Sequence, residues 1–148
     1  MAYTKRVLLT AVLGLAAVLG CKKKESPTVG ADSSVVVNAP PFRVELINLG
    51  KSIDADKRVA NGTDNFAPTD TIYASVVTEG SAPSKTIVAR WTFQDGQVVK
   101  EETQTIAPSG AAATEFHIMK PSGWPVGKYK VEILVDGASV GTKEFEVK

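Results

Sequence analysis

From residue 42 to the end of the chain, hydrophobic and polar residues alternate with a period of two instead of following the spacing of an amphipathic helix. In the segment 42–46, for example, Phe, Val and Leu alternate with Arg and Glu. Segments with this period are half-buried strands, because successive side chains of a strand point to opposite faces of the sheet. We therefore expect about seven strands, at residues 42–48, 71–78, 85–94, 97–105, 112–119, 127–135 and 139–147.

Turn-forming residues separate these segments. Asp95-Gly96 and Asp136-Gly137 each lie between two alternating runs, and an Asp-Gly pair supplies the positive φ angles of a tight hairpin. Pro-Ser-Gly interrupts the chain at 108–110 and again at 121–123. The only long loop expected is 50–69, which is rich in Asp, Asn, Gly and Pro. Short strands joined by regular turns predict an all-β fold, either a sandwich or a barrel.

Two aromatic residues favour the sandwich. Trp91 lies in the middle of the strand expected at 85–94, and Tyr129 lies near the start of the strand at 127–135, within the sequence Gly-Lys-Tyr-Lys-Val. These positions resemble the core tryptophan and the tyrosine corner of immunoglobulin-like domains. Residues 124–147 also resemble the last hairpin of bacterial immunoglobulin-like or fibronectin-III-like domains. The resemblance covers roughly residues 66–148 and implies an immunoglobulin-like antiparallel β-sandwich.

The resemblance also implies how this sandwich is held together. In the tyrosine-corner motif, the tyrosine stands two residues before the second core cysteine of the family's disulfide. Here Val131 takes that position, and Val76 is the expected partner on the facing strand. An apolar contact would thus replace the disulfide. The fold itself says little about function, because it carries many unrelated activities.

The N-terminal segment has the pattern of an export signal. Lys5 and Arg6 precede an apolar run at 7–19, and Gly20 lies before Cys21, the only cysteine of the chain. A basic start, a short apolar run and a small residue before the cleavage point describe a signal peptide. The cysteine directly after that point resembles the lipobox of bacterial lipoproteins. This resemblance implies cleavage between Gly20 and Cys21 and acylation of the Cys21 thiol.

Two other interpretations of this segment remain open. One is a transmembrane anchor, although a membrane span needs roughly 20 apolar residues. The other is an ordinary secretory signal followed by a free thiol. On the lipoprotein interpretation, the chain divides into a signal peptide at 1–20, a lipidated cysteine with a flexible tether at 21–41, and the β-sandwich at 42–148.

Charge and cysteine content narrow the choice of partners. Removal of residues 1–20 leaves 15 basic and 16 acidic side chains, so there is no basic excess with which to bind nucleic acid. The lysines at 22–24 would lie beside the lipid, where they either add attraction to an anionic membrane or keep the tether solvated. With Cys21 acylated, no thiol remains for a disulfide, and packing alone must hold the fold.

Candidate catalytic residues are few. His117 is the only histidine, no Gly-x-Ser-x-Gly turn accompanies it, and the alternation around it predicts that it faces solvent. His117 and Met119 would share one strand face and could bind copper, but they are two ligands only. Trp124 either plugs one end of the sandwich or presents an aromatic ring to a ligand. We therefore expect no enzyme activity and no cofactor.

The loop at 50–69 carries the one set of candidate metal ligands. Asp54, Asp56 and Asp64 are weak candidates for a Ca²⁺ site, because clustered carboxylates can bind this ion. Their spacing differs from that of an EF-hand loop, and a Lys-Arg pair directly follows Asp56. The alternative is a solvated loop in which Asp and Asn side chains form local turns.

The sequence as a whole predicts a membrane-anchored lipoprotein that acts as a non-catalytic interaction or structural module of the cell envelope. Its partners would be the membrane, through the lipid, and an envelope protein. Because Lys22 follows Cys21, the resemblance to lipoproteins implies the outer membrane, facing the periplasm, in a Gram-negative cell. The alternatives are an inhibitor or chaperone-like binder of an exported enzyme and a carrier of calcium, copper or a small ligand.

Overall fold

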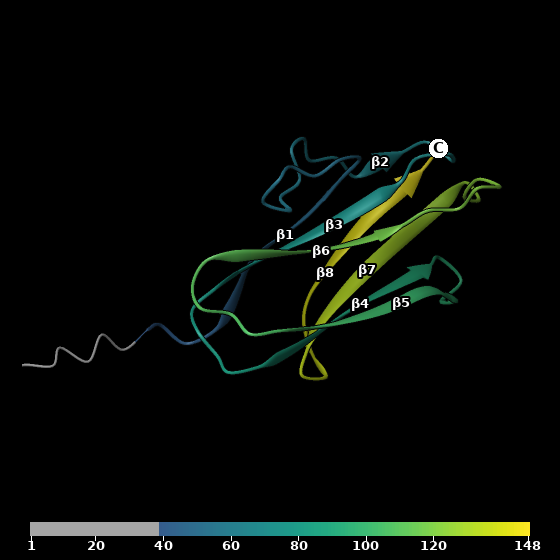
Figure 1. The fold of residues 1–148 in the computed structure, drawn as a ribbon. Coiled ribbons are helices and arrows are strands. Elements are labelled where there is room, and N and C mark those ends of the chain that lie inside the picture. The colour runs from purple at the N-terminus through teal and green to yellow at the C-terminus, as the bar shows by residue number, and fades with distance from the viewer. Residues whose placement is uncertain (1–38) are drawn as a thin grey trace, which may run out of the picture. The chain divides into compact units, whose positions relative to one another are not determined.

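The computed structural model describes residues 39–148, and within them it contains strands and no helix (Figure 1). In this part of the chain, accordingly, no helix could cross a membrane. The predicted signal peptide, Gly20, Cys21 and nearly all of the predicted tether lie outside the described residues. The strands are β1 (Arg43–Gly50), β2 (Asn65–Phe66), β3 (Ile72–Glu79), β4 (Lys85–Phe93), β5 (Val98–Ile106), β6 (Ala112–Ile118), β7 (Gly127–Val135) and β8 (Ala138–Val147).

The strands form two sheets that pack face to face (Figure 1). One sheet has the order β1-β3-β6, and the other has the order β2-β8-β7-β4-β5. Every pair of neighbours is antiparallel except β2 with β8. Among the long strands, the first, second and fifth thus form one sheet, and the third, fourth, sixth and seventh form the other. This is an immunoglobulin-like arrangement, and the predicted all-β sandwich is confirmed.

The core lies between the sheets and is built from the inward-facing residue of each alternating run. Trp91 of β4 and Phe116 of β6 are fully buried, and Phe145 of β8 meets Trp91 edge-on with ring centroids 5.9 Å apart. Val76 of β3 and Val131 of β7, the pair expected in place of a disulfide, are both fully buried in the same core. Burial of each such side chain contributes about 1.5–3 kcal/mol to folding.

The alternation located the long strands to within two residues, but it missed β2. The structure therefore has eight strands where about seven were predicted. Two residues are too short a segment to show a period. The pairing of β2 also depends on β8, since Asn65 lies opposite Glu146 and Phe66 opposite Val147. Nothing local in the loop sequence indicates such a distant partner.

The segment 51–63 folds back over the outer face of the three-stranded sheet. The buried hydroxyl of Ser75, on β3, donates a hydrogen bond to the main-chain carbonyl of Lys57 at 2.8 Å. An isolated bridge joins Ile53 to Val59 within the segment, and another joins Gly62 to Gly50 at the end of β1. This cover explains in part why the β3 sequence lacks a polar face: its outward-pointing Ser75 is as buried as its inward-pointing residues.

Only one of the two Asp-Gly pairs forms the tight hairpin expected of it. Asp136 and Gly137 alone connect β7 to β8, and both have positive φ, 49° and 84°. Between β4 and β5 the connection is longer, at residues 94–97, and Gly96 there has positive φ whereas Asp95 does not. The Asp95 carboxylate instead accepts a hydrogen bond from the Gln97 N–H at 2.9 Å, which is an Asx-type turn.

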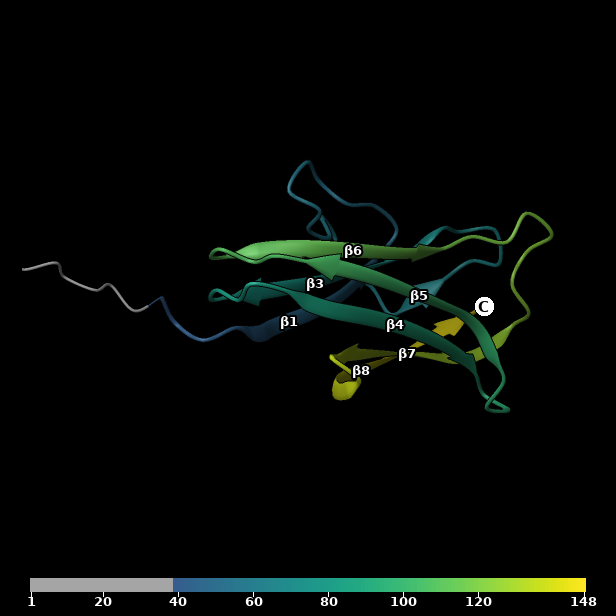
Figure 2. The same ribbon diagram turned by 60° about the horizontal axis from the view of Figure 1, so that its bottom comes forward.

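One lateral opening between the sheets is closed by side chains. Strands β5 and β6, which belong to different sheets, run beside each other (Figure 2). Lys100 Nζ on β5 donates to the carbonyl of His117 at 2.9 Å, and Gln104 Nε2 donates to the carbonyl of Glu115 at 2.7 Å. The edge of β6 is thereby covered. The opposite opening, between β1 and β8, is different.

Candidate binding groove along the edge of strand β8

Strand β8 is paired with β7 along its whole length, but its other edge is covered only at the C-terminal end. There the N–H of Glu146 donates to the carbonyl of Asp64 at 2.8 Å, and that of Lys148 donates to Phe66 at 2.9 Å. Main-chain groups two residues apart in a strand point to the same side. The N–H and C=O groups of Thr142 and Glu144 therefore also point away from β7, and no partner strand covers them among the described residues.

Two hollows flank this edge. One, of about 420 Å³, lies between β1 and β8 and is lined by Ile47 and Leu49 on one side and by Lys143 and Glu144 on the other. The wall formed by Ile47 and Leu49 is apolar and belongs to the core. The remaining lining residues are mostly polar and include Thr63, Asp64 and Lys143, so this hollow is a largely polar surface depression near the end of β8.

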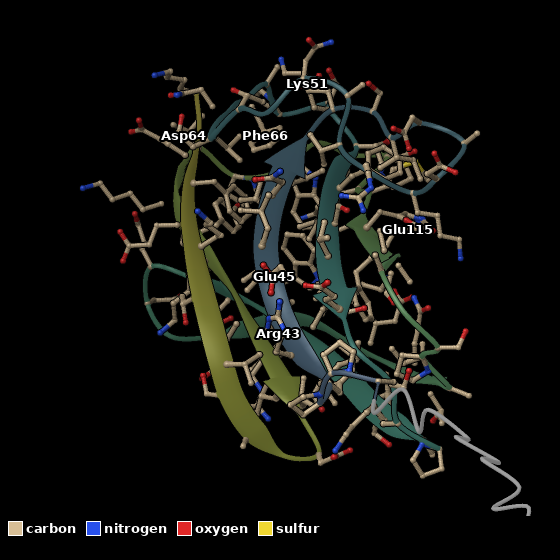
Figure 3. All side chains as sticks on the ribbon, turned by 90° about the vertical axis from the view of Figure 1, so that its left-hand side faces the viewer. Arg43, Glu45, Lys51, Asp64, Phe66 and Glu115 are labelled. Carbon is tan, nitrogen blue, oxygen red and sulfur yellow. The ribbon has the colours of Figure 1, made fainter. Side chains whose placement is uncertain are left out.

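The other hollow, of about 470 Å³, lies over β7 and the end of β8 and is lined by residues that include Phe93, Gln94, Lys128, Lys130 and Glu146. Both hollows share Asp64 and Glu144 in their linings. Figure 3 shows Asp64 beside the end of β8, near Phe66. The two hollows thus meet at Glu144, near the C-terminal end of β8, and residues 138–142 line neither of them.

Phe66 belongs to β2, the short strand that pairs with this edge, and its side chain is buried in the core. It is 2% exposed, and its ring meets that of Phe145 edge-on with centroids 5.5 Å apart. The two-residue strand β2 thus pairs by its main chain and places one aromatic side chain in the core. Beyond β2, toward the start of β8, Ile47 packs against Gly141: a Cβ on Gly141 would lie 2.6 Å from Ile47 Cδ1.

The neighbouring edge of β1 is blocked by charge and by an irregular backbone. Its pairing with β3 shifts register between Val44 and Leu46, which is the mark of a β-bulge. Arg43 forms ion pairs with Glu45 on its own strand and with Glu79 of β3. Figure 3 shows Arg43 and Glu45 side by side on β1. Bulges and charges of this kind protect edge strands from pairing with other chains.

The two aromatic residues singled out in the sequence both lie in the core. Trp91 is fully buried, and its indole N–H has no hydrogen-bond partner among the described residues. Tyr129 is 3% exposed, and its hydroxyl donates to the carbonyl of Pro125, four residues upstream, at 2.7 Å. That bond is the one the tyrosine-corner resemblance implies. Burial and then the negative charge of Asp95 raise the pKa of the Tyr129 phenol.

The candidate calcium ligands are not brought together. The Asp54 carboxylate accepts hydrogen bonds from the N–H groups of Asp56, at 2.9 Å, and Arg58, at 2.8 Å. Asp64 bonds the side chain of Asn65 and lies on the rim of the groove. Within residues 39–148, no three His, Cys, Asp or Glu side chains gather as they would around a metal ion. Asp54 thus forms the kind of local turn that the sequence offered as the alternative.

His117 and Met119 are exposed, and Met119 is 64% accessible. The His117 ring stands 5.4 Å from that of Tyr73 and contacts Glu115 through Nδ1 at 3.3 Å. Trp124 packs partly against the core, and its ring meets that of Tyr129 edge-on at 6.2 Å. Trp124 therefore covers one end of the sandwich.

The carboxyl and guanidinium groups whose pKa values are shifted lie in ion pairs near the ends and on the faces of the sheets. A hydrogen bond from Lys51 at 2.8 Å, then one from the Ala67 N–H, lowers the pKa of Asp70. Lys85, and then the Thr86 N–H, lowers the pKa of Asp136 in the same way. These interactions tie loops to strands, and none of them places a nucleophile beside a base.

The groove residues were not found from the sequence. The one local signal was the run Ala138–Thr142, which is the first part of a strand and carries no charge. Whether such a run lies at an edge depends on sheet order, which the sequence pattern did not contain. Gly20 and Cys21, the predicted cleavage and lipidation residues, lie outside the described residues.

Comparison with known proteins gives structural similarities only. No protein-family model matches the sequence, and no curated protein matches it. Among solved structures, an immunoglobulin-like protein of Pseudomonas aeruginosa is 12% identical, covers 74% of this chain and 98% of its own, and has a TM-score of 0.48.

Two further structures are less similar. An alkylpurine DNA glycosylase of Pseudomonas fluorescens, bound to DNA, is 18% identical over 72% of this chain and 30% of its own, with a TM-score of 0.44. The CARDB domain of a Pyrococcus furiosus protein, in complex with di-metal ions, is 14% identical over 74% of this chain and 91% of its own, with a TM-score of 0.41. The strand order and register described above therefore define the fold of this chain: an immunoglobulin-like β-sandwich.

Proposed function

We propose that the protein is a lipid-anchored, non-catalytic interaction module of the cell envelope. The observation that carries the proposal is the sequence ending in Gly20-Cys21, in which a basic start and a short apolar run precede the single cysteine. A lipid on Cys21 would confine the β-sandwich to a membrane surface and raise its effective concentration toward partners there.

The chemistry of the described domain supports a binding role. The ionisable side chains whose pKa values are shifted take part in surface ion pairs or, in the case of Tyr129, in a hydrogen bond of the core. Its surface has an uncovered edge along the first part of β8 and two hollows near the C-terminal end of that strand. Main-chain edges and adjacent hollows recognise other polypeptides more readily than they perform bond chemistry.

Anchoring is tested by Cys21→Ser. We expect this variant to lose incorporation of labelled palmitate, to stay uncleaved or become soluble, and to leave the detergent phase on partitioning. A Cys21→Ser/Ser34→Cys variant keeps one thiol near the domain and is the matched control; it should also stay unlabelled. Full labelling of either variant, or normal processing of Cys21→Ser, would show that the lipoprotein proposal is wrong.

The proposed location has its own test. Lys22 follows Cys21, and in Gram-negative lipoproteins a residue other than aspartate at that position accompanies transfer to the outer membrane. We expect the protein in the outer-membrane fraction of such a cell and Lys22→Asp in the inner-membrane fraction. Equal distribution of both proteins across a density gradient would contradict the proposed sorting while leaving the anchor intact.

A second candidate function is an inhibitor or chaperone-like binder of an exported protein. The edge of β8 favours it, because strand addition at a sandwich edge is a known mode of peptide recognition. Photo-crosslinking from Thr142 in intact cells, with Val98 on β5 as the control position, would distinguish the two. A product formed only from Thr142 and containing one exported enzyme supports the binder, whereas products with resident envelope proteins support the structural module.

A further inference from the structure

We propose that Asn61-Gly62, in the loop that covers the three-stranded sheet, is a site of spontaneous deamidation, and that the isoaspartate formed there loosens the segment 51–63 from the end of β1. The reaction needs water and no enzyme. It goes beyond the proposed role as an interaction module, because it is a covalent change that the domain's own chain undergoes.

Asn61 is the only asparagine of this chain that stands before a glycine. The other three, Asn38, Asn48 and Asn65, precede alanine, leucine and phenylalanine. Deamidation begins when the main-chain nitrogen of the following residue attacks the carbon of the side-chain amide. Glycine has no Cβ to hinder this approach and reaches backbone conformations that other residues avoid. The Asn61-Gly62 step is therefore the most reactive of the four.

The reaction balances without an oxidant or a cofactor. The Gly62 nitrogen loses its proton and bonds to Cγ of Asn61, the Cγ–Nδ2 bond breaks, and ammonia leaves, so that a cyclic succinimide forms. Water then opens one of the two imide bonds. Breaking the bond from nitrogen to Cγ gives aspartate. Breaking the bond from nitrogen to the main-chain carbonyl carbon gives isoaspartate, in which the main chain runs through Cβ and Cγ.

The structure leaves the attacking nitrogen free. Asn61 and Gly62 are both exposed. Gly62 faces Gly50 in an isolated antiparallel bridge, and the Thr63 N–H donates to the Leu49 carbonyl at 2.9 Å. In this pattern the hydrogen bonds come from the residues that flank the pair, so the N–H of Gly62 itself points away from β1. No main-chain carbonyl in the described part of the chain accepts it.

Other residues with related chemistry are held by hydrogen bonds. The side chain of Asn65 bonds that of Asp64. Gly96, which follows Asp95, donates its N–H to the carbonyl of Phe93 at 2.8 Å, so the nitrogen that would form a succinimide there is already bonded. A carboxylate is also a poorer target for nucleophilic attack than an amide. The fold therefore favours reaction at one loop position over the others.

An isoaspartate at position 61 would change how the segment 51–63 is attached. The Asn61 carbonyl oxygen lies against Gly50, where a Cβ would stand 2.8 Å from it. Isoaspartate adds a carbon to the main chain at this point, so the residues on its two sides cannot both keep their present positions along the end of β1. The same segment carries Lys57, whose carbonyl accepts from the buried Ser75 hydroxyl. Loosening the segment thus uncovers the outer face of β3.

The test follows the purified full chain in detergent micelles during incubation in neutral and mildly alkaline buffer. Peptide mapping by mass spectrometry should find the mass change of an amide converted to an acid in the peptide that contains Asn61, with isoaspartate among the products. The rate should rise with pH, because the attacking nitrogen must lose its proton. The peptides that contain Asn48 and Asn65 are internal controls and should stay unmodified.

A synthetic peptide of residues 58–64 provides the reference rate. A site that reacts only after local unfolding is slower than its peptide by the cost of that opening. Because the Gly62 N–H is free in the folded loop, we expect the rate in the protein to lie within about tenfold of the rate in the peptide.

Two variants separate the reaction from its effect. Gly62 does not have positive φ, and a Cβ there would meet only the Leu49 carbonyl oxygen at 3.8 Å. Gly62→Ala should therefore fold normally and deamidate more slowly by about tenfold or more. Asn61→Asp supplies the charge of the product with a normal main chain. The Thr63 amide should exchange its hydrogen about tenfold faster in the purified isoaspartate form and at an unchanged rate in Asn61→Asp.

Three results would overturn the proposal. The first is an intact Asn61 after an incubation that converts the peptide completely. The second is a Gly62→Ala variant that reacts as fast as the natural chain. The third is an isoaspartate form in which exchange at Thr63 is unchanged, because the segment would then have stayed attached to β1.

Discussion

The hydroxyl of Tyr129 donates a hydrogen bond to the main-chain carbonyl of Pro125 at 2.7 Å and so fastens the start of β7 to the connection that precedes it. The Tyr129 ring also stacks on Phe145 of β8, with centroids 5.3 Å apart and planes 13° from parallel. Tyr129 thus stabilises both the core and the loop that covers one end of the sandwich.

Tyr129→Phe and Tyr129→Ala separate these two contributions. The first keeps the ring and removes one hydrogen bond, so we expect a loss on the order of 1 kcal/mol in unfolding free energy. The second also leaves a cavity and should cost about 3–5 kcal/mol. Out of a total of roughly 5–15 kcal/mol, that loss is severe. Urea unfolding curves would measure both, and unchanged midpoints would contradict the role of Tyr129.

Gly80 and Gly96 form a matched pair, because their φ angles are 89° and 86°. Alanine at either position adopts an unfavourable left-handed conformation, at about 1 kcal/mol. A Cβ on Gly96 meets open space, whereas one on Gly80 would collide with the carbonyl oxygen of Pro41. We therefore expect Gly80→Ala to lose about 1–3 kcal/mol more than Gly96→Ala. Equal unfolding midpoints would show that Pro41 does not pack against Gly80 in solution.

Asp136 should make stability depend on pH. The ammonium group of Lys85, and then the Thr86 N–H, lowers the pKa of Asp136 in the folded state. The resulting stabilisation is present above the unfolded pKa, which is about 3.9, and is lost as pH falls through the lower folded pKa.

The control for this prediction is Asp136→Asn, which keeps a side-chain oxygen for the Thr86 N–H and tolerates positive φ. At neutral pH and low salt we expect the variant to be less stable than the natural chain, with the difference shrinking as Asp136 becomes protonated. Unfolding midpoints measured from pH 7 to pH 2 would show it. A difference that stays constant over this range would exclude a contribution from the Lys85–Asp136 pair.

The closed opening between β5 and β6 gives a prediction about aggregation. Gln104→Ala removes the donor to the Glu115 carbonyl, and Lys100→Met removes the donor to the His117 carbonyl while keeping the aliphatic chain. We expect each loss to cost on the order of 1 kcal/mol and the double variant to aggregate faster, because the edge of β6 becomes accessible. Thioflavin fluorescence would follow this, with Thr103→Ala on β5 as control.

Local features of this protein were readable from its sequence because each depends on residues a few positions apart. The alternation around Trp91 is one such feature. The turn at Asp136-Gly137 is another, since both residues have positive φ there. The bond from Tyr129 to Pro125 spans four residues. Backbone geometry and side-chain alternation determine all three before any distant contact is made.

Which strand edges are covered and which are exposed was determined by the tertiary structure. Whether Thr142 faces a neighbour or an opening depends on Asp64 and Phe66, which lie far away in the sequence and cover only the end of β8. Likewise, the sequence allowed Asp54 to be either an ion ligand or part of a local turn. In the folded loop its carboxylate accepts hydrogen bonds from two main-chain N–H groups. Periodicity specifies which face of a strand is buried; which strands become neighbours depends on how both sheets pack around one core.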